Sequence, residues 1–270
     1  MKDKNSNFYL DGKKLYGDDF DSSEIESWFK DETEAYANLG AKQLENYEYN
    51  YHAFNRINGF SFLPNNLIFN NTLSFGGAWG NELIPIKNRL RNIKILEPSD
   101  NFYDTGLFEN KVEYLKPQKT GEIPFTDNSF DLILCLSVLH HIPNVTKVMS
   151  EIYRISKSGG YVLIREPIVS MGDWGGKRNK GLTKRERGIP LKIFREIIKN
   201  LNFILLKENL GMFAPISKLG RLLGKSTYNN NFLVKSDRIL SNLFYFNYRY
   251  HSNTFVGKFC PSAVFYVLRK

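Results

Sequence analysis

The sequence predicts a doubly wound α/β protein with a mainly parallel sheet of seven strands. Seven short apolar runs follow Pro64, and helical stretches separate most of them, which is typical of βαβ units. The chain has 270 residues, enough to bury a large core. Hydrophobic residues make up 42% and charged residues 24%, which excludes a disordered or coiled-coil protein.

The strands are expected at the apolar runs. They are predicted near residues 72–75, 93–97, 112–115, 131–136, 161–165, 203–207 and 263–268. In a doubly wound sheet, ligands bind at the carboxyl ends of the strands, near the point where the strand order reverses. Candidate functional residues are therefore sought in the loops after the first, second, fourth and fifth runs.

The N-terminal part has a different pattern. Apolar residues recur at helical spacing over 21–39, where Asp21 and Glu24 have the form of a capping box. A second helical pattern over 44–54 ends before a glycine. We therefore expect residues 1–65 to form a helical cap.

The rest of the chain, 66–270, is expected to be the sheet domain, with 211–260 as a helical insertion before the last strand. The insertion is too long for a plain loop and contains two short amphipathic patterns. It holds seven Lys/Arg against one Asp/Glu, whereas residues 1–50 hold six against twelve. This asymmetry indicates either an anionic partner or a solvated basic face. We expect the insertion and the N-terminal segment together to cover an acceptor site.

The turn after the first strand contains glycines at positions 76, 77 and 80, and a helix is predicted from Asn81. Glycines allow the backbone to approach a ligand, and the amides at a helix start favour negative charge. Glu97 ends the second strand, where a carboxylate can accept hydrogen bonds from ribose hydroxyls. The pair predicts a nucleotide site.

Further along, the chain reads PFTDNSFDLILCLSVLHHI and then EIYRISKSGGYVLIREP. With these motifs it resembles the class I S-adenosylmethionine-dependent methyltransferases over about residues 70–166. The resemblance implies a Rossmann-like methyltransferase fold with a reversed last strand. It also implies S-adenosylmethionine as cofactor.

By position, the resemblance assigns donor-binding roles to several residues. Gly76 and Gly80 match the first and last glycines of the donor loop and would border the methionine part. Glu97 would hold the ribose, Ser137 would lie beside the transferred methyl, and residues 122–125 would border the adenine.

Three positions depart from the family pattern. Ser74 stands where the family usually has an acidic residue, Ala78 replaces the middle glycine of the donor loop, and Lys119 aligns with an acidic residue that meets the adenine amine. Backbone and water hydrogen bonds can replace part of these contacts. Weaker donor binding is expected, with an inactive relative as the alternative.

The candidate catalytic residues are His140, His141 and Glu166, which follow the fourth and fifth strands. A neutral imidazole can accept a proton at pH 7, and Glu166 is a second candidate base. Positioning or helix capping is the alternative role for the histidines, and a structural ion pair, with Arg165 or the basic loop, for Glu166. Two adjacent histidines without a nearby carboxylate do not predict a metal site.

Six basic residues lie between Lys177 and Arg187, after a glycine-rich stretch. Such a segment could close over an anionic acceptor, with Arg185 and Arg187 holding phosphate or carboxylate. A solvated loop is the alternative.

The sequence thus predicts methyl transfer to an O or N of a small molecule or saccharide, with a phosphate- or lipid-bearing acceptor left open. A nucleic-acid-binding protein is the alternative from another class, because aromatic residues and Arg249 alternate over 244–250. A nicotinamide dehydrogenase fits less well, since the glycines do not follow G-x-G-x-x-G. Without a signal peptide or a long apolar run, a cytoplasmic protein is expected.

Overall fold

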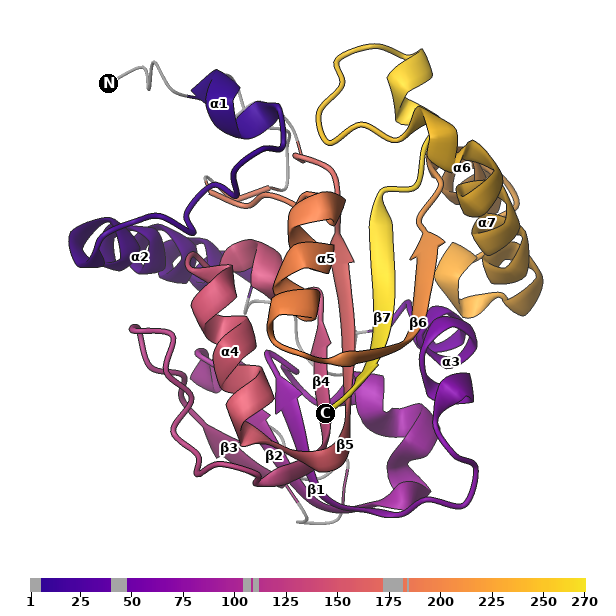
Figure 1. Ribbon diagram of the computed structural model, residues 1–270. Coiled ribbons are helices and arrows are strands. Elements are labelled where there is room, and N and C mark those ends of the chain that lie inside the picture. Colours follow the sequence, from indigo (N-terminus) through magenta and orange to yellow (C-terminus); the bar gives the residue numbers. More distant parts are fainter. Residues whose placement is uncertain (1–5, 40–47, 104–107, 109–111, 172–181, 184) are drawn as a thin grey trace.

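One sheet forms the centre of the molecule in the computed structural model (Figure 1). The structure describes residues 6–39, 48–103, 108, 112–171, 182–183 and 185–270. Within these residues, the sheet has seven strands in the order β3-β2-β1-β4-β5-β7-β6. The strands are β1 (Phe69–Phe75), β2 (Leu90–Leu96), β3 (Val112–Leu115), β4 (Phe130–Leu136), β5 (Ser156–Pro167), β6 (Ile204–Gly211) and β7 (Ala263–Arg269). All seven predicted strands are confirmed.

The strand directions also agree with the predicted doubly wound fold. β1 is parallel to β2 and β4, β2 to β3, and β4 to β5, while β7 is antiparallel to β5 and β6. The order reverses between β1 and β4, so the loops after these two strands leave the sheet side by side. A site is expected at this edge.

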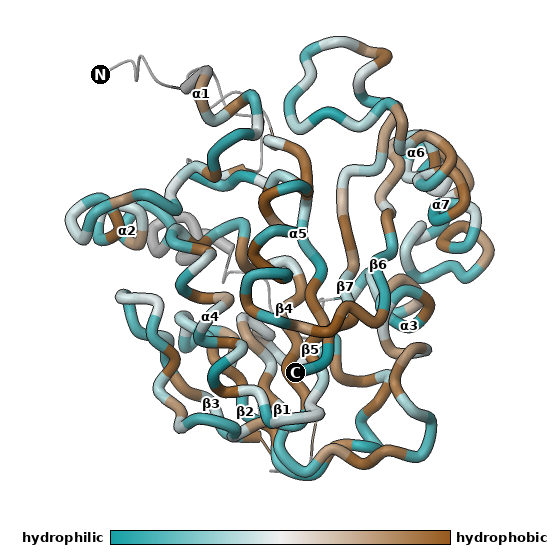
Figure 2. Tube along the Cα trace, viewed as in Figure 1, coloured by the Kyte–Doolittle hydropathy of each residue, from teal (hydrophilic) through white to brown (hydrophobic). Residues whose placement is uncertain are grey.

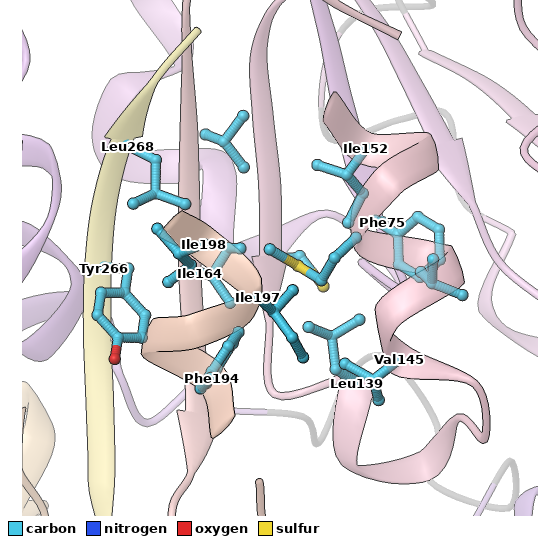
Figure 3. Packing of buried hydrophobic residues seen from close by; sticks show 14 of the residues in the cluster. Phe75, Leu139, Val145, Ile152, Ile164, Phe194, Ile197, Ile198, Tyr266 and Leu268 are labelled. Carbon is cyan, nitrogen blue, oxygen red and sulfur yellow. The ribbon is translucent and has the colours of Figure 1, made fainter. Parts of the chain in front are cut away.

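The core lies on both faces of the sheet because successive side chains of a buried strand point to opposite sides. In β4, Ile133 and Cys135 join the cluster under α4 (Val145–Ile155) and α5 (Leu191–Asn200), whereas Leu132 and Leu134 join the cluster on the other face. Figure 3 shows side chains of both helices meeting the sheet, and Figure 2 shows the apolar strands at the centre. Each buried aliphatic side chain contributes roughly 1.5–3 kcal/mol.

The N-terminal helix α2 (Ser22–Leu39) begins at the predicted capping box. The Asp21 N–H donates to Glu24 Oε2 at 2.9 Å, and Asp21 Oδ1 accepts from the N–H groups of Ser23 and Glu24. Trp28 is fully buried, and its indole N–H donates to the His141 carbonyl at 2.7 Å. This contact fixes α2 against the loop that follows β4.

The other helices within the described residues are largely as expected. They are α1 (Ser6–Leu10), α3 (His52–Asn58), α6 (Ala214–Leu222) and α7 (Asn231–Leu243). The predicted second N-terminal helix begins only at His52, and residues 44 and 47 lie outside the described residues. The helix after the glycine turn, η3 (Asn81–Arg89), is a 3₁₀ helix, and its Pro85 lacks the N–H that an α-helical bond to Asn81 requires.

The insertion forms the two predicted helices, α6 and α7. Leu219, Leu222 and Ile239 are exposed, while Ile216 and Leu233 pack with Phe213 in a small separate core. None of the helices in the described residues is long and apolar enough to cross a membrane.

Candidate functional site

The loop after β1 has an unusual backbone. Gly76, Ala78 and Gly80 have φ values of 68°, 47° and 75°, in the left-handed region that favours glycine. A Cβ atom at Gly76 would lie 2.6 Å from Val138 Cγ1, so a side chain there would collide with the loop after β4. Ala78 has a Cβ atom, so its positive φ is a strained conformation. The N–H of Ala78 donates to Glu97 Oε2 at 3.1 Å.

A second carboxylate lies beneath this loop. Ser74 is buried, and its hydroxyl donates to Oε1 of Glu82, which is also buried. A Cβ at Gly77 would lie 2.0 Å from Ser74 Oγ, so only glycine leaves room for this pair. Burial raises the pKa of Glu82 to about 7. Glu82 was not singled out in the sequence analysis. Its carboxylate lies eight residues after Ser74, which stands where the family usually has an acidic residue, and this spacing was a usable signal.

Glu97 follows β2 and is 2% exposed. Its carboxylate accepts hydrogen bonds from the N–H groups of Ala78 and Ser99 at 3.1 and 3.2 Å. Burial raises the pKa of Glu97 to about 7, although these bonds lower it in part. A carboxylate has about four lone-pair positions, so Glu97 can accept further hydrogen bonds.

Two cavities meet at Phe75 and Gly76, which line both. The larger, which we call cavity A, has a volume of about 340 Å³, and the smaller, cavity B, about 220 Å³. Cavity A is lined mainly by apolar residues, which include Phe29, Leu96, Pro98, Ile123, Val138 and Ile142, and its polar lining includes Glu32 and His141. Cavity B is lined mainly by polar and aromatic residues, which include Tyr49, Tyr51, Ser74, Glu82, Ser137 and Arg165, and Ala78 lines it as well. Pockets of this size hold small ligands.

Arg165 connects several of the residues around cavity B. Its guanidinium donates to Ser137 Oγ at 2.9 and 3.0 Å and to Asn55 Oδ1 at 2.7 Å, and it lies 4.2 Å from the centre of the Tyr51 ring. Ser137 has a φ of 66°, which turns the chain sharply at the end of β4. Glu82 adds a carboxylate to the same cavity. Cavity B therefore contains donors and acceptors for a ligand that carries both charges.

The three candidate catalytic residues lie in different environments. Glu166 is fully buried, and Oε1 accepts from the N–H groups of Val138 and Leu139 at 2.7 and 2.8 Å. Its Oε2 lies 2.7 Å from Nδ1 of His140, which is 6% exposed. Neither lines cavity A or B, whereas His141 lines cavity A.

Carboxylates surround the two histidines. Nε2 of His140 lies 3.5 Å from Glu186 Oε1, and Nδ1 of His141 lies 3.0 Å from Glu32 Oε2. Burial alone would lower the pKa of His140, but Glu166 and Glu186 outweigh it and raise the pKa to about 9. Burial and the neighbouring His140 lower the pKa of His141, so its ring is neutral at pH 7.

Residues 73–164 match a sequence model of the family described as "Methyltransferase domain". This stretch runs from β1 to β5 and carries the glycine loop, Glu97 and the histidine pair. This part of the chain is a methyltransferase domain.

Curated relatives are similar over this domain. The phthiotriol/phenolphthiotriol dimycocerosates methyltransferase 1 of Mycobacterium ulcerans is 30% identical over 113 residues, 38% of this chain and 41% of that protein. The ubiquinone/menaquinone biosynthesis C-methyltransferase of Brucella canis is 27% identical over 106 residues, 35% of this chain and 39% of that protein. The chain thus spans about two fifths of these relatives' length.

Solved structures share the fold of the methyltransferase domain. Phosphoethanolamine N-methyltransferase 2 of Haemonchus contortus has a TM-score of 0.53 at 20% identity, covering 80% of this chain and 52% of that one. The S-adenosylmethionine-dependent methyltransferase of Mesorhizobium loti has a TM-score of 0.50 at 13% identity, covering 78% and 95%. These similarities confirm the predicted fold class.

The structure corrects the expected role of the basic segment next to the methyltransferase domain. Residues 177, 178, 180 and 184 lie outside the described residues. Arg187 is fully buried and donates to the carbonyls of Tyr16, Leu139 and Ile142 at 2.8–2.9 Å, so it does not face an acceptor. Arg185 pairs with Asp31 of α2.

No carboxylate was found near the two adjacent histidines in the sequence, and therefore no metal site was predicted, but the structure places a carboxylate beside them. One ligand atom each of His140, His141 and Glu186 lie within 4.8 Å of one another, because residue 186 is distant in sequence but packs against the histidines. Glu166 pairs with His140, and no ion pair with Arg165 is found among the described residues. Glu32 and Glu186 were missed, since nothing in the sequence indicates these contacts.

The insertion does not cover the cavities as expected. No residue of 211–260 lines cavity A or B, but two of its residues contact the lining of cavity B. Tyr228 stacks on Tyr51 at 5.5 Å, and the Asn229 side chain donates to the Tyr49 carbonyl at 2.8 Å. The aromatic run over 244–250 is partly core: the hydroxyls of Tyr248 and Tyr250 donate to the carbonyls of Ile168 and Gly188. Helix α2, by contrast, does cover cavity A through Phe29 and Glu32.

Proposed function

We propose that this protein transfers a methyl group from S-adenosylmethionine to an oxygen or nitrogen atom of a small-molecule or saccharide acceptor. The observation that carries the proposal is the meeting of cavities A and B at Gly76, with the buried Glu97 next to it. Glu97 lies in the chain between Leu96 and Pro98, which line cavity A, and accepts from the N–H of Ala78, which lines cavity B. This arrangement offers an apolar space for a base, a carboxylate for a ribose and a polar space for an amino acid. It lies where the strand order reverses, as ligand sites of doubly wound sheets do.

The residues present fit this cofactor. Leu96, Pro98 and Ile123 supply apolar surface for the adenine in cavity A, and Glu97 accepts hydrogen bonds from the ribose hydroxyls. At Gly76 a Cβ would meet Val138, and the bare backbone leaves the passage between the two cavities open.

We assign cavity B to the methionine part. Arg165 is placed to pair with the carboxylate, and Glu82 with the amino group. Glu82 would then take over the role of the acid that Ser74 replaces. On this account the departure at position 74 changes where the carboxylate comes from and leaves the donor site functional.

S-adenosylmethionine supplies a methyl group on a sulfonium, so the protein mainly has to align the acceptor, which can contribute several kcal/mol. Where the accepting atom carries a proton, we propose His141 as the general base. Its Nδ1–H donates to Glu32, because a carboxylate can only accept, and the lone pair of the neutral ring is then on Nε2. His140 and Glu166 are positioning residues, since they hold the loop after β4 through the bonds to Val138 and Leu139.

The experiment that tests this function is methyl transfer from radiolabelled S-adenosylmethionine. Sugar phosphates, nucleotide sugars, amines and lipid extracts would be screened as acceptors, with calorimetric titration of S-adenosylhomocysteine alongside. We expect saturable binding and a labelled product from at least one class. No binding at millimolar concentration would contradict the proposal, and binding without any labelled product would favour the inactive relative.

A further inference from the structure

The helical insertion exposes large apolar side chains that a protein normally buries. We call these the insertion surface. They lie on α6, on α7 and in the loop that follows: Leu219, Leu222, Leu223, Phe232, Ile239, Leu243, Phe246, Phe255 and Val256. Leu222 is 85% exposed, Phe246 81% and Phe232 76%. A cluster of exposed apolar residues of this kind marks an interaction site.

The spacing of these residues places them on stripes. With about 3.6 residues per turn, positions 232, 239 and 243 fall on one side of α7, and positions 219, 222 and 223 on one side of α6. On their buried sides, Ile216 of α6 and Leu233 of α7 pack with Phe213. The exposed stripes therefore belong to helices that pack against each other. Figure 1 shows α6 and α7 next to each other on one flank of the molecule, beside β6.

The charge around these stripes has one sign. Residues 211–260 contain seven basic residues and one acidic residue. Lys218, Arg221, Lys225 and Lys235 are exposed. The acidic residue, Asp237, is fully buried and accepts from the N–H groups of Met212 and Phe213 at 2.9 and 2.7 Å. The exposed part of the insertion therefore carries positive charge only.

We propose that the insertion surface binds the face of a lipid bilayer that contains anionic phospholipids. Exposed apolar side chains flanked by Lys and Arg suit this occupant, because the apolar groups enter the headgroup region while the cations meet the phosphates. A second copy paired through the same surface would bring two sets of positive charges together. This proposal concerns where the protein binds and does not depend on methyl transfer.

Vesicle flotation with the full chain tests it. The vesicles consist of phosphatidylcholine alone or of phosphatidylcholine with one third phosphatidylglycerol. We expect binding to the anionic vesicles that weakens as salt is added, because screening shortens to about 8 Å at physiological ionic strength. The double variant L222Q/F246Q should bind at least tenfold more weakly, and so should K218Q/R221Q. Both pairs are exposed, so folding is retained, as circular dichroism would verify.

The matched control is L67Q/I68Q, which changes two exposed apolar residues outside the insertion. It should bind as the unmodified protein does. The proposal is overturned if the protein does not float with the anionic vesicles, or if L222Q/F246Q binds them as strongly as the control does. It is also overturned if sedimentation without lipid shows a dimer that L222Q/F246Q abolishes, since the surface would then belong to a second copy.

Discussion

The Nδ1 atom of His141 lies 3.0 Å from Oε2 of Glu32, and this contact joins the loop after β4 to helix α2. Glu32 also accepts from the Thr183 hydroxyl at 2.7 Å, which fixes the orientation of its carboxylate. A carboxylate that accepts the Nδ1–H in this way sets the tautomer of the neutral ring, with the lone pair on Nε2. On our account the N-terminal helix therefore positions the catalytic base as well as covering cavity A.

Changing Glu32 to Gln should lower kcat at least tenfold with little change in donor affinity. The rate should rise with pH through a pKa below 6.5, because protonated His141 cannot accept a proton and its pKa is lowered by burial and by His140. In E32Q this pKa should fall further, since a carboxylate that favours the protonated ring is gone. Steady-state kinetics across pH 5–8 measure both effects.

Glu26→Gln is the control for that experiment, because it makes the same change on an exposed position of α2. Its pH profile should match that of the unmodified enzyme. An unchanged kcat in E32Q would rule out the proposed role of Glu32 in orienting His141.

Changing Glu82 to Gln distinguishes the contributions of cavities A and B to ligand binding. It should weaken the binding of S-adenosylhomocysteine at least tenfold, or about 1.4 kcal/mol, because the carboxylate that meets the amino group is lost. The binding of 5′-methylthioadenosine, which lacks the amino acid part, should stay the same. Calorimetric titration of both ligands makes the comparison. An equal loss for both would mean that Glu82 supports the loop and does not contact the ligand.

Changing Arg187 to Ala should destabilise the protein by about 3 kcal/mol, since three buried carbonyls lose a charged donor and Trp28 loses a guanidinium 5.2 Å from its ring. Arg185→Ala should cost only about 0–1 kcal/mol, because its ion pair with Asp31 lies nearer the surface. Urea unfolding of both variants tests this. Equal stabilities, together with a raised KM for R187A, would restore the acceptor-binding role first expected of the segment.

The sheet could be predicted because it depends on short-range patterns. β3 has the predicted bounds, and most other strand ends lie a few residues beyond the predicted apolar runs, because pairing with neighbours continues a strand past its apolar core. Two ends fall short by one residue: β2 ends at Leu96, and β6 begins at Ile204. The capping box of α2 is also local and was found. The exposure of the leucines of α6 and α7 could not be predicted, because periodicity identifies an apolar stripe and does not tell which way it faces.

The site was predicted only where it follows the strands. Gly76, Ser137 and His141 line the cavities as residues after β1 and β4 should, whereas Glu32 and Glu186 reach the histidines from segments that carry no motif. Glu82 follows the glycine turn directly and could have been found from it. Arg187 could not be separated from its basic neighbours, since the burial of one of six basic residues depends on tertiary packing. Long-range contacts of this kind need a structure.

The most direct test of the central claim is the calorimetric affinity for S-adenosylhomocysteine at pH 6 and pH 8, measured for the unmodified protein and for Glu97→Ala. Burial raises the pKa of Glu97 to about 7, so the carboxylate becomes ionised between these two pH values and accepts hydroxyl hydrogen bonds more strongly. We predict tighter binding at pH 8 for the unmodified protein, and for E97A a loss of roughly 1–3 kcal/mol at pH 8. The affinity of E97A should depend less on pH, and its remaining dependence comes from Glu82, whose pKa burial also raises to about 7. Equal affinity of the two proteins at pH 8 would contradict the donor site at the carboxyl end of β2.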